Sequence, residues 1–131
     1  MPISYPCNEL PGAGATLDIA PGIRWVRMPL PFSLDHVNLW LIEDGDGWTA
    51  VDTGISLDML KDNWRKLLTQ HRLTRQIVTH CHPDHLGLAA WLEQESGAPL
   101  WITQGEFAFG HLLRAGTDAF GISAMLQLYR R

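Results

Sequence analysis

Three histidines and one aspartate lie within the segment T-H-C-H-P-D-H-L-G, residues 79–87. The whole chain contains only 6 histidines, so half of them are concentrated in this segment. Imidazole nitrogens combined with a carboxylate suit Zn, Fe or Mn better than Ca or Mg. The residue types and their density therefore predict a site for a divalent metal in residues 79–87.

The spacing within this segment predicts two pairs of metal ligands. His80 and His82 are two residues apart, so on an extended chain their side chains leave on the same side and can bind one ion. Pro83 turns the chain, which lets Asp84 and His85 point to a second place. Two metals about 3.5–4 Å apart activate a bridging water for attack on an ester, amide or phosphoester. The intervening Cys81 faces the other way and is predicted to fill the core.

The elements around this segment follow from the hydrophobic pattern. Alternating or continuous apolar residues predict strands over 23–28, 37–43, 48–54, 76–79 and 99–103. The sequence D-G-D-G, residues 44–47, predicts a hairpin between the second and third of these strands. The fourth strand runs directly into the histidine segment.

Helical spacing of apolar residues appears between these strands. One helix is predicted over 56–68, with Ser56 as its N-cap, and another over 86–96. Thr103 and Glu106 form a capping box that opens a third helix, and a final apolar-periodic run covers 122–131. This alternation favours a mixed sheet with helices on one face. Asp52, at the end of a predicted strand, is then expected at the same sheet edge as the histidine segment.

Length, composition and charge restrict the class of protein. The chain has 131 residues, the size of one domain, and residues 1–22 are rich in Pro and Gly, which predicts an irregular lead-in. The net charge of −4 argues against nucleic-acid binding, and no run of apolar residues is long enough for a membrane span. Only 2 cysteines are present, which favours a reducing, cytoplasmic setting.

The segment T-H-C-H-P-D-H-L-G resembles the HxHxDH signature of the metallo-β-lactamase superfamily, and V-D-T-G, residues 51–54, resembles its first motif. The resemblance runs from about Ile23 through at least Gly97. It implies an αββα sandwich with a metal site at one edge, and a divalent cation, with Zn expected first and Fe or Mn as alternatives.

The resemblance also implies a role for each site residue. His80 and His82 correspond to ligands of a first metal, and Asp84 and His85 to ligands of a second. Asp84 also corresponds to a catalytic residue that orients the attacking water. Asp52 corresponds to a residue that supports the histidine segment by hydrogen bonding.

The superfamily's remaining ligands come from a second half of the domain, well downstream of HxHxDH. His111 is the only later histidine, and it falls inside the predicted third helix; Asp118 is a weaker candidate. We therefore expect residues 23–131 to form the N-terminal half of a metallo-β-lactamase-like domain, inactive by itself. The bare sheet face of such a half predicts a homodimer.

Three functions remain open at this point. The first is hydrolysis of a small-molecule ester, thioester, lactone or lactam by a metal-activated water, with this chain as an N-terminal fragment of a one- or two-metal enzyme. The second is an iron-dependent redox reaction on the same fold, which metal analysis would separate from the first. The third is a non-catalytic, dimerising half-domain that binds metal weakly. The substrate stays undefined, because the pocket walls would come mostly from the other half.

Overall fold

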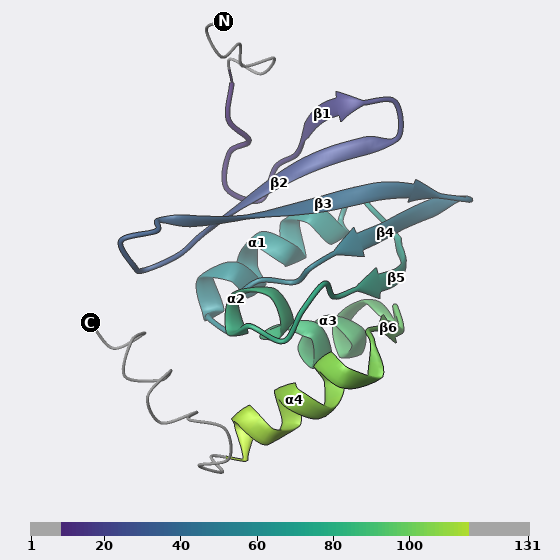
Figure 1. Cartoon of the computed structure of the whole chain (residues 1–131). Coiled ribbons are helices and arrows are strands. Elements are labelled where there is room, and N and C mark those ends of the chain that lie inside the picture. The colour runs from purple at the N-terminus through teal and green to yellow at the C-terminus, as the bar shows by residue number, and fades with distance from the viewer. Residues whose placement is uncertain (1–8, 116–131) are drawn as a thin grey trace, which may run out of the picture.

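The computed structural model describes residues 9–115, and the strands of this part form one six-stranded sheet (Figure 1). The strands lie side by side in chain order. The pairs from β1 to β4 are antiparallel, whereas β4–β5 and β5–β6 are parallel, so the predicted mixed sheet is confirmed. The strands are β1 (Leu17–Ala20), β2 (Ile23–Pro29), β3 (His36–Asp44), β4 (Gly47–Val51), β5 (Leu73–Ile77) and β6 (Leu100–Trp101).

The described part of the chain contains four helices: α1 (Asp58–Leu68), α2 (Pro83–Leu86), α3 (Ala89–Ser96) and α4 (Gln104–Arg114). Apolar residues of α1 and α3 form one buried cluster with those of the central strands, so these two helices cover the same face of the sheet. None of the helices described here has the length and apolar character needed to cross a bilayer.

Trp64, in the middle of α1, connects this core to the edge of the sheet. Its side chain has no exposed surface, and its indole Nε1–H donates to the carbonyl of Thr53, 2.7 Å away. The buried indole thus has both an apolar environment and a partner for its one polar group. The core therefore fixes the backbone immediately after β4, where the V-D-T-G segment lies.

Several element boundaries differ from the sequence predictions. Residues 1–22 were predicted to be irregular, but they contain a strand, β1, which pairs with β2 at the edge of the sheet. This edge strand is mostly exposed, so its sequence does not have to alternate between apolar and polar residues. The N-cap of α1 is Leu57 rather than Ser56, and no side chain caps this helix. The predicted run over 122–131 lies outside the described residues.

Strand β5 begins at Leu73, earlier than the predicted strand at 76–79. Two of its polar residues, Thr74 and Arg75, obscured the pattern, because they bind one carboxylate at the end of β3. Asp44 Oδ2 accepts hydrogen bonds from Thr74 Oγ1, at 2.6 Å, and from Arg75 Nε, at 2.8 Å. Residues 78–79 then continue past the strand into the histidine segment.

The parallel pairing of β4 and β5 decides where the site lies. Val51 and Ile77 are paired in register, so both strands end at the same edge of the sheet. The Asp52 amide donates to the carbonyl of Ile77 at 2.8 Å, which joins the two strand ends. The predicted proximity of Asp52 and the histidine segment is therefore confirmed.

Candidate metal centre

Asp52 occupies an unusual backbone conformation at the end of β4. Its φ is +65°, in the left-handed region that few residues other than Gly adopt, and Asp is among the side chains that tolerate it. The residue is buried, with 5% of its surface exposed. A strained, buried carboxylate at a strand end is a feature typical of functional sites.

The Asp52 carboxylate binds both ends of the histidine segment. Oδ1 accepts the amide N–H of Thr79 at 2.8 Å, and Oδ2 accepts Nδ1–H of His85, also at 2.8 Å. Burial raises the pKa of Asp52, but the hydrogen bonds from His85 and Thr79 outweigh it and hold this pKa below its ordinary value. The same bond to Asp52 raises the pKa of His85. Asp52 is therefore ionised and can only accept.

Thr79 extends this influence to His80. The Thr79 hydroxyl lies 2.9 Å from Asp52 Oδ2 and 2.9 Å from Nδ1 of His80. Because the hydroxyl has one hydrogen and Asp52 can only accept, that hydrogen goes to Asp52, and His80 Nδ1–H donates to the hydroxyl oxygen. Asp52 thus sets the tautomer of His85 directly and of His80 through Thr79. In both rings Nε2 is left as the nitrogen that can bind a cation.

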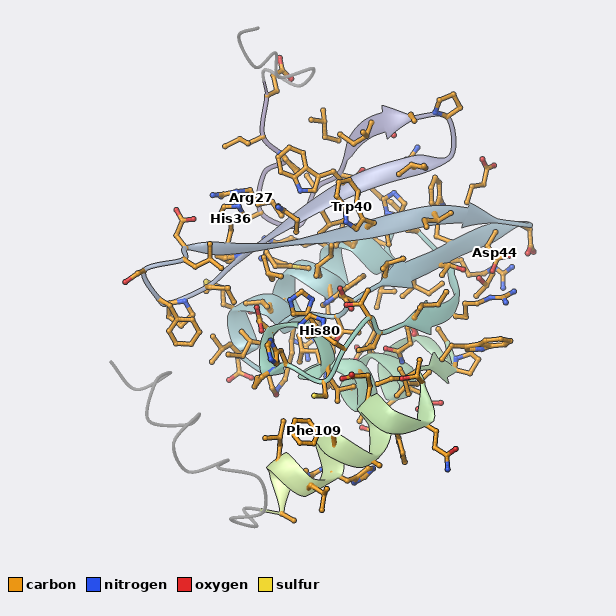
Figure 2. All side chains as sticks on the ribbon, viewed as in Figure 1. Arg27, His36, Trp40, Asp44, His80 and Phe109 are labelled. Atoms are coloured by element: carbon orange, nitrogen blue, oxygen red, sulfur yellow. The ribbon has the colours of Figure 1, made fainter. Side chains whose placement is uncertain are left out.

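Three imidazoles of the histidine segment lie together, and Figure 2 labels one of them, His80. The ring centroids of His80 and His82 are 4.6 Å apart, and those of His80 and His85 are 4.1 Å apart. Burial, together with repulsion from His85 and His82, lowers the pKa of His80. The neutral form that this favours is the form that binds metals.

The position of His85 differs from the predicted separation into two ligand pairs. Pro83 does not simply turn the chain away; it occupies the first position of the short helix α2. The amide of His85 donates to the carbonyl of His82 at 2.9 Å, so α2 folds His85 back towards His80. Asp84 stays close to His85, with its Oδ2 3.4 Å from His85 Nε2. The three imidazoles therefore lie in one group, while His80 stays adjacent to His82 and Asp84 to His85, so the assignment of these pairs to two metals stays a prediction.

The V-D-T-G segment also holds the backbone of the histidine segment by hydrogen bonds. The amide and the hydroxyl of Thr53 both donate to the carbonyl of His85, at 2.8 and 2.7 Å. The amide of Leu88 donates to the carbonyl of Gly54 at 3.0 Å. Two consecutive residues after Asp52 therefore fix the backbone at the end of α2 and just beyond it.

Glu106 is a site residue that the sequence predicted only as part of the capping box of α4. Its amide donates to the Thr103 hydroxyl at 3.4 Å, as the capping box predicts. Its carboxylate, however, accepts the amide N–H of Cys81 at 2.8 Å. Burial and a hydrogen bond to Glu106 raise the pKa of the Cys81 thiol to about 11. Cys81 is a buried, protonated thiol, and its predicted place in the core is confirmed.

The remaining candidates do not join this group. His111 lies on α4, as predicted, and its ring contacts Phe107 at a centroid distance of 4.5 Å. Asp118 lies outside the described residues.

The donor chemistry fits a divalent cation of the zinc type. His80 and His85 have their Nδ1 atoms engaged and Asp84 adds a carboxylate, which is the ligand mixture that Zn accepts. Within residues 9–115, however, no three His, Cys, Asp or Glu side chains converge on one point in a way that would hold an ion. The rings instead pack against one another, so binding requires a change in side-chain torsions.

Solved structures resemble this arrangement. A beta-lactamase domain protein from Burkholderia ambifaria is 47% identical, with a TM-score of 0.79, over 85% of this chain and 36% of its own. A metallo-beta-lactamase family protein from Thermus thermophilus is 27% identical, with a TM-score of 0.67, over 86% of this chain and 38% of its own. The metallo-beta-lactamase FIM-1 from Pseudomonas aeruginosa, in a mono-zinc form, shares the fold at 19% identity and a TM-score of 0.55, over 73% of this chain and 44% of its own.

These comparisons also show what the chain covers. It spans little more than a third of the length of the first two structures. No curated protein gave a significant match. The family model of the metallo-beta-lactamase superfamily matches residues 33–125, which is most of the sequence. The chain therefore belongs to the metallo-beta-lactamase superfamily.

Proposed function

We propose that this chain carries the metal-binding part of a hydrolase that cleaves a small-molecule ester, thioester, lactone or lactam. The observation that carries this proposal is the control that Asp52 exerts over two imidazoles, His85 directly and His80 through Thr79. Such fixing of a ligand's tautomer and orientation raises metal affinity. A purely structural carboxylate would have no need to orient two neighbouring histidines in the same way.

His80, His82, Asp84 and His85 would hold the cation, with Zn as the first expectation. A bound cation of this kind supplies Lewis-acid chemistry that lowers the pKa of water towards neutrality. Asp84, half-buried and beside His85 Nε2, is the residue that we propose orients the attacking water. Superfamily membership supports a hydrolytic fold, and the net charge of −4 favours small substrates over nucleic acids.

The test is a chimera in which this chain replaces the matching segment of the Burkholderia ambifaria relative. The chimera is assayed with a chromogenic ester, a thioester, a lactone and a β-lactam. We expect hydrolysis of one class, loss of that hydrolysis when a chelator removes the metal, and recovery on adding Zn²⁺. The chain by itself is expected to remain near the uncatalysed rate. A folded, zinc-loaded chimera that hydrolyses none of the four, or is unaffected by the chelator, would refute the proposal.

We further propose that the chain alone forms a homodimer through the sheet face opposite the helices. One apolar residue from each strand forms a continuous in-register row on this face: Leu17, Trp25, Trp40, Val51, Ile77 and Trp101. None of the row is buried, and Trp101 is 56% exposed. Figure 2 shows Trp40 on the side of β3 away from the helices. An apolar row that crosses a whole sheet marks an interaction surface.

Ile77→Lys is expected to disrupt this dimer, because it places a charge in the row. Light scattering coupled to size-exclusion chromatography measures the mass of wild type and variant at the same concentration. The control is Met59→Lys, which makes the same change at another exposed apolar residue, on α1. A wild-type mass equal to that of one chain, or equal dissociation by both variants, would contradict the dimer.

A further inference from the structure

The histidine segment is held by carboxylates on two different elements. Asp52, at the end of β4, binds the amide of Thr79. Glu106, in the first turn of α4, binds the amide of Cys81. These two amides lie on either side of His80, and the second also lies between His80 and His82. The backbone that carries the two histidines is therefore fixed from both sides.

The position of Glu106 is built into the packing of α4. Thr103 caps this helix and accepts the Glu106 amide, which sets the first turn. Gly110 lies one turn further on the same helix face, where an added Cβ would come within 2.7 Å of Leu86 and 3.6 Å of the Cys81 side chain. The absence of a side chain at this position lets α4 approach the histidine segment closely enough for Glu106 to reach Cys81.

The hydrogen bonding of Glu106 differs from that of a simple capping residue. In a capping box, the Glu side chain returns to the backbone of its own N-cap. Here the carboxylate accepts from Cys81, 25 residues earlier in the chain. It accepts both the backbone N–H and the thiol of this residue, and these two bonds lower the pKa of Glu106. It also lies close enough to His80 and His82 for their charges to act on it.

We propose that Glu106 is a positioning residue for cation binding: by holding the Cys81 amide, it fixes the backbone between His80 and His82 so that both imidazoles can face one ion. This role rests on the proposed function, because it presumes that His80 and His82 bind a metal. Glu106 itself does not coordinate the cation. It acts through the peptide backbone, in the way that Asp52 acts through Thr79.

The test is a Co²⁺ titration of the full 131-residue chain, with affinity measured by competition against a chromophoric chelator. The visible absorption of bound Co²⁺ reports the geometry of its ligands. Glu106→Ala is expected to weaken Co²⁺ binding by about 10–100-fold and to change this spectrum. Glu95→Gln is the control, since it removes a carboxylate from the neighbouring helix α3 that pairs with Arg65 of α1.

Two conservative variants separate position from charge. Glu106→Gln loses the charge but keeps an oxygen at the same place, so it is expected to retain the wild-type spectrum and most of the affinity. Glu106→Asp keeps the charge but withdraws the oxygen by about 1.5 Å, one carbon–carbon bond, so it is expected to bind more weakly than Glu106→Gln. A role in charge alone predicts the opposite order. This contrast decides the matter even if Glu106→Ala does not fold.

The outcomes distinguish the two proposals. If wild type binds Co²⁺ and all Glu106 variants match it in affinity and spectrum, the positioning role is refuted and the proposed function stands. Glu106→Asp binding as tightly as Glu106→Gln, or more tightly, also refutes it. If wild type takes up no Co²⁺, both proposals fail together.

Discussion

Replacing His80 and His82 together with alanine is expected to weaken Zn²⁺ binding by the chain more than about 100-fold. Loss of a single hydrogen-bond partner behind a metal-binding histidine typically costs about 10–100-fold in affinity. The double variant removes two of the four proposed ligands, so its effect must exceed that range. Asp84 and His85 remain, but two ligands fall short of the three or four protein ligands of a zinc site.

The fold is expected to survive this double substitution. The bonds that hold the segment run from Asp52 to Thr79 and to His85, and from Glu106 to the Cys81 backbone. None of them needs the side chains of His80 or His82. Circular dichroism of the metal-free variant should therefore match wild type, so that any loss of zinc reports the site itself.

The matched control is the pair His36→Ala and His111→Ala. It removes the same number of imidazoles, from β3 and from α4, where they contact Asp35 and Phe107. Zinc affinity, measured by competition with a chelator, should be unchanged in this control. Equal zinc uptake by wild type and by the His80→Ala/His82→Ala variant would end the interpretation of residues 79–87 as a metal site.

The features that sequence predicted correctly depend on local signals. The D-G-D-G hairpin formed as expected because Gly45, with φ +62°, satisfies a turn that other residues resist. Apolar strands that end in V-D-T-G and in T-H-C-H predicted two polar loops at one sheet edge. The parallel pairing of β4 and β5 then brings those loops together. Each step needed only a few neighbouring residues and a rule about sheets.

The features that sequence missed depend on contacts between distant residues. The Thr103–Glu106 spacing had a complete local explanation as a capping box, so nothing in it pointed to Cys81. Thr74 and Arg75 interrupt the apolar pattern of β5. Their place in a strand is explained only by Asp44, at the end of β3, which accepts a hydrogen bond from each. Glu106 is partly exposed and already has a role in the helix cap. Its second role, at the histidine segment, becomes visible only once the approach of α4 to that segment is known.

The glycine at the end of T-H-C-H-P-D-H-L-G is the position where adding one methyl group is expected to damage both fold and site. A Cβ on Gly87 would lie 2.3 Å from the carbonyl oxygen of Pro83, 2.9 Å from the amide nitrogen of Ser56 and 3.0 Å from the carbonyl oxygen of Gly54. All three are backbone atoms, so no flexible side chain can move aside. The clash separates α2 from the V-D-T-G segment, which this packing holds together.

Two opposing effects on the free energy of unfolding decide whether Gly87→Ala stabilises or destabilises the chain. The residue has φ −57° and ψ −33°, which alanine adopts freely, so reduced freedom of the unfolded chain favours the variant by up to about 1 kcal/mol. Overpacking against fixed atoms costs typically about 1–3 kcal/mol, and more where nothing can relax. Three contacts of 3.0 Å or less place this site at the upper end of that range. We therefore expect Gly87→Ala to lower the free energy of unfolding, measured by urea denaturation of the metal-free chain, by about 2–3 kcal/mol net.

Gly105→Ala is the matched control. It makes the same chemical change at a position where the change in the free energy of unfolding should have the opposite sign. A Cβ on Gly105, in the first turn of α4, would meet nothing within 4 Å. Alanine is preferred to glycine in helices by up to about 1 kcal/mol, so this variant should be neutral or more stable than wild type. Zinc affinity should fall only in Gly87→Ala, since the contacts of Gly54 and Thr53 with α2 and the residues after it orient His85. Stabilisation by both substitutions would mean that the close packing around Gly87 does not hold in solution, and the support of the histidine segment by V-D-T-G would have to be abandoned.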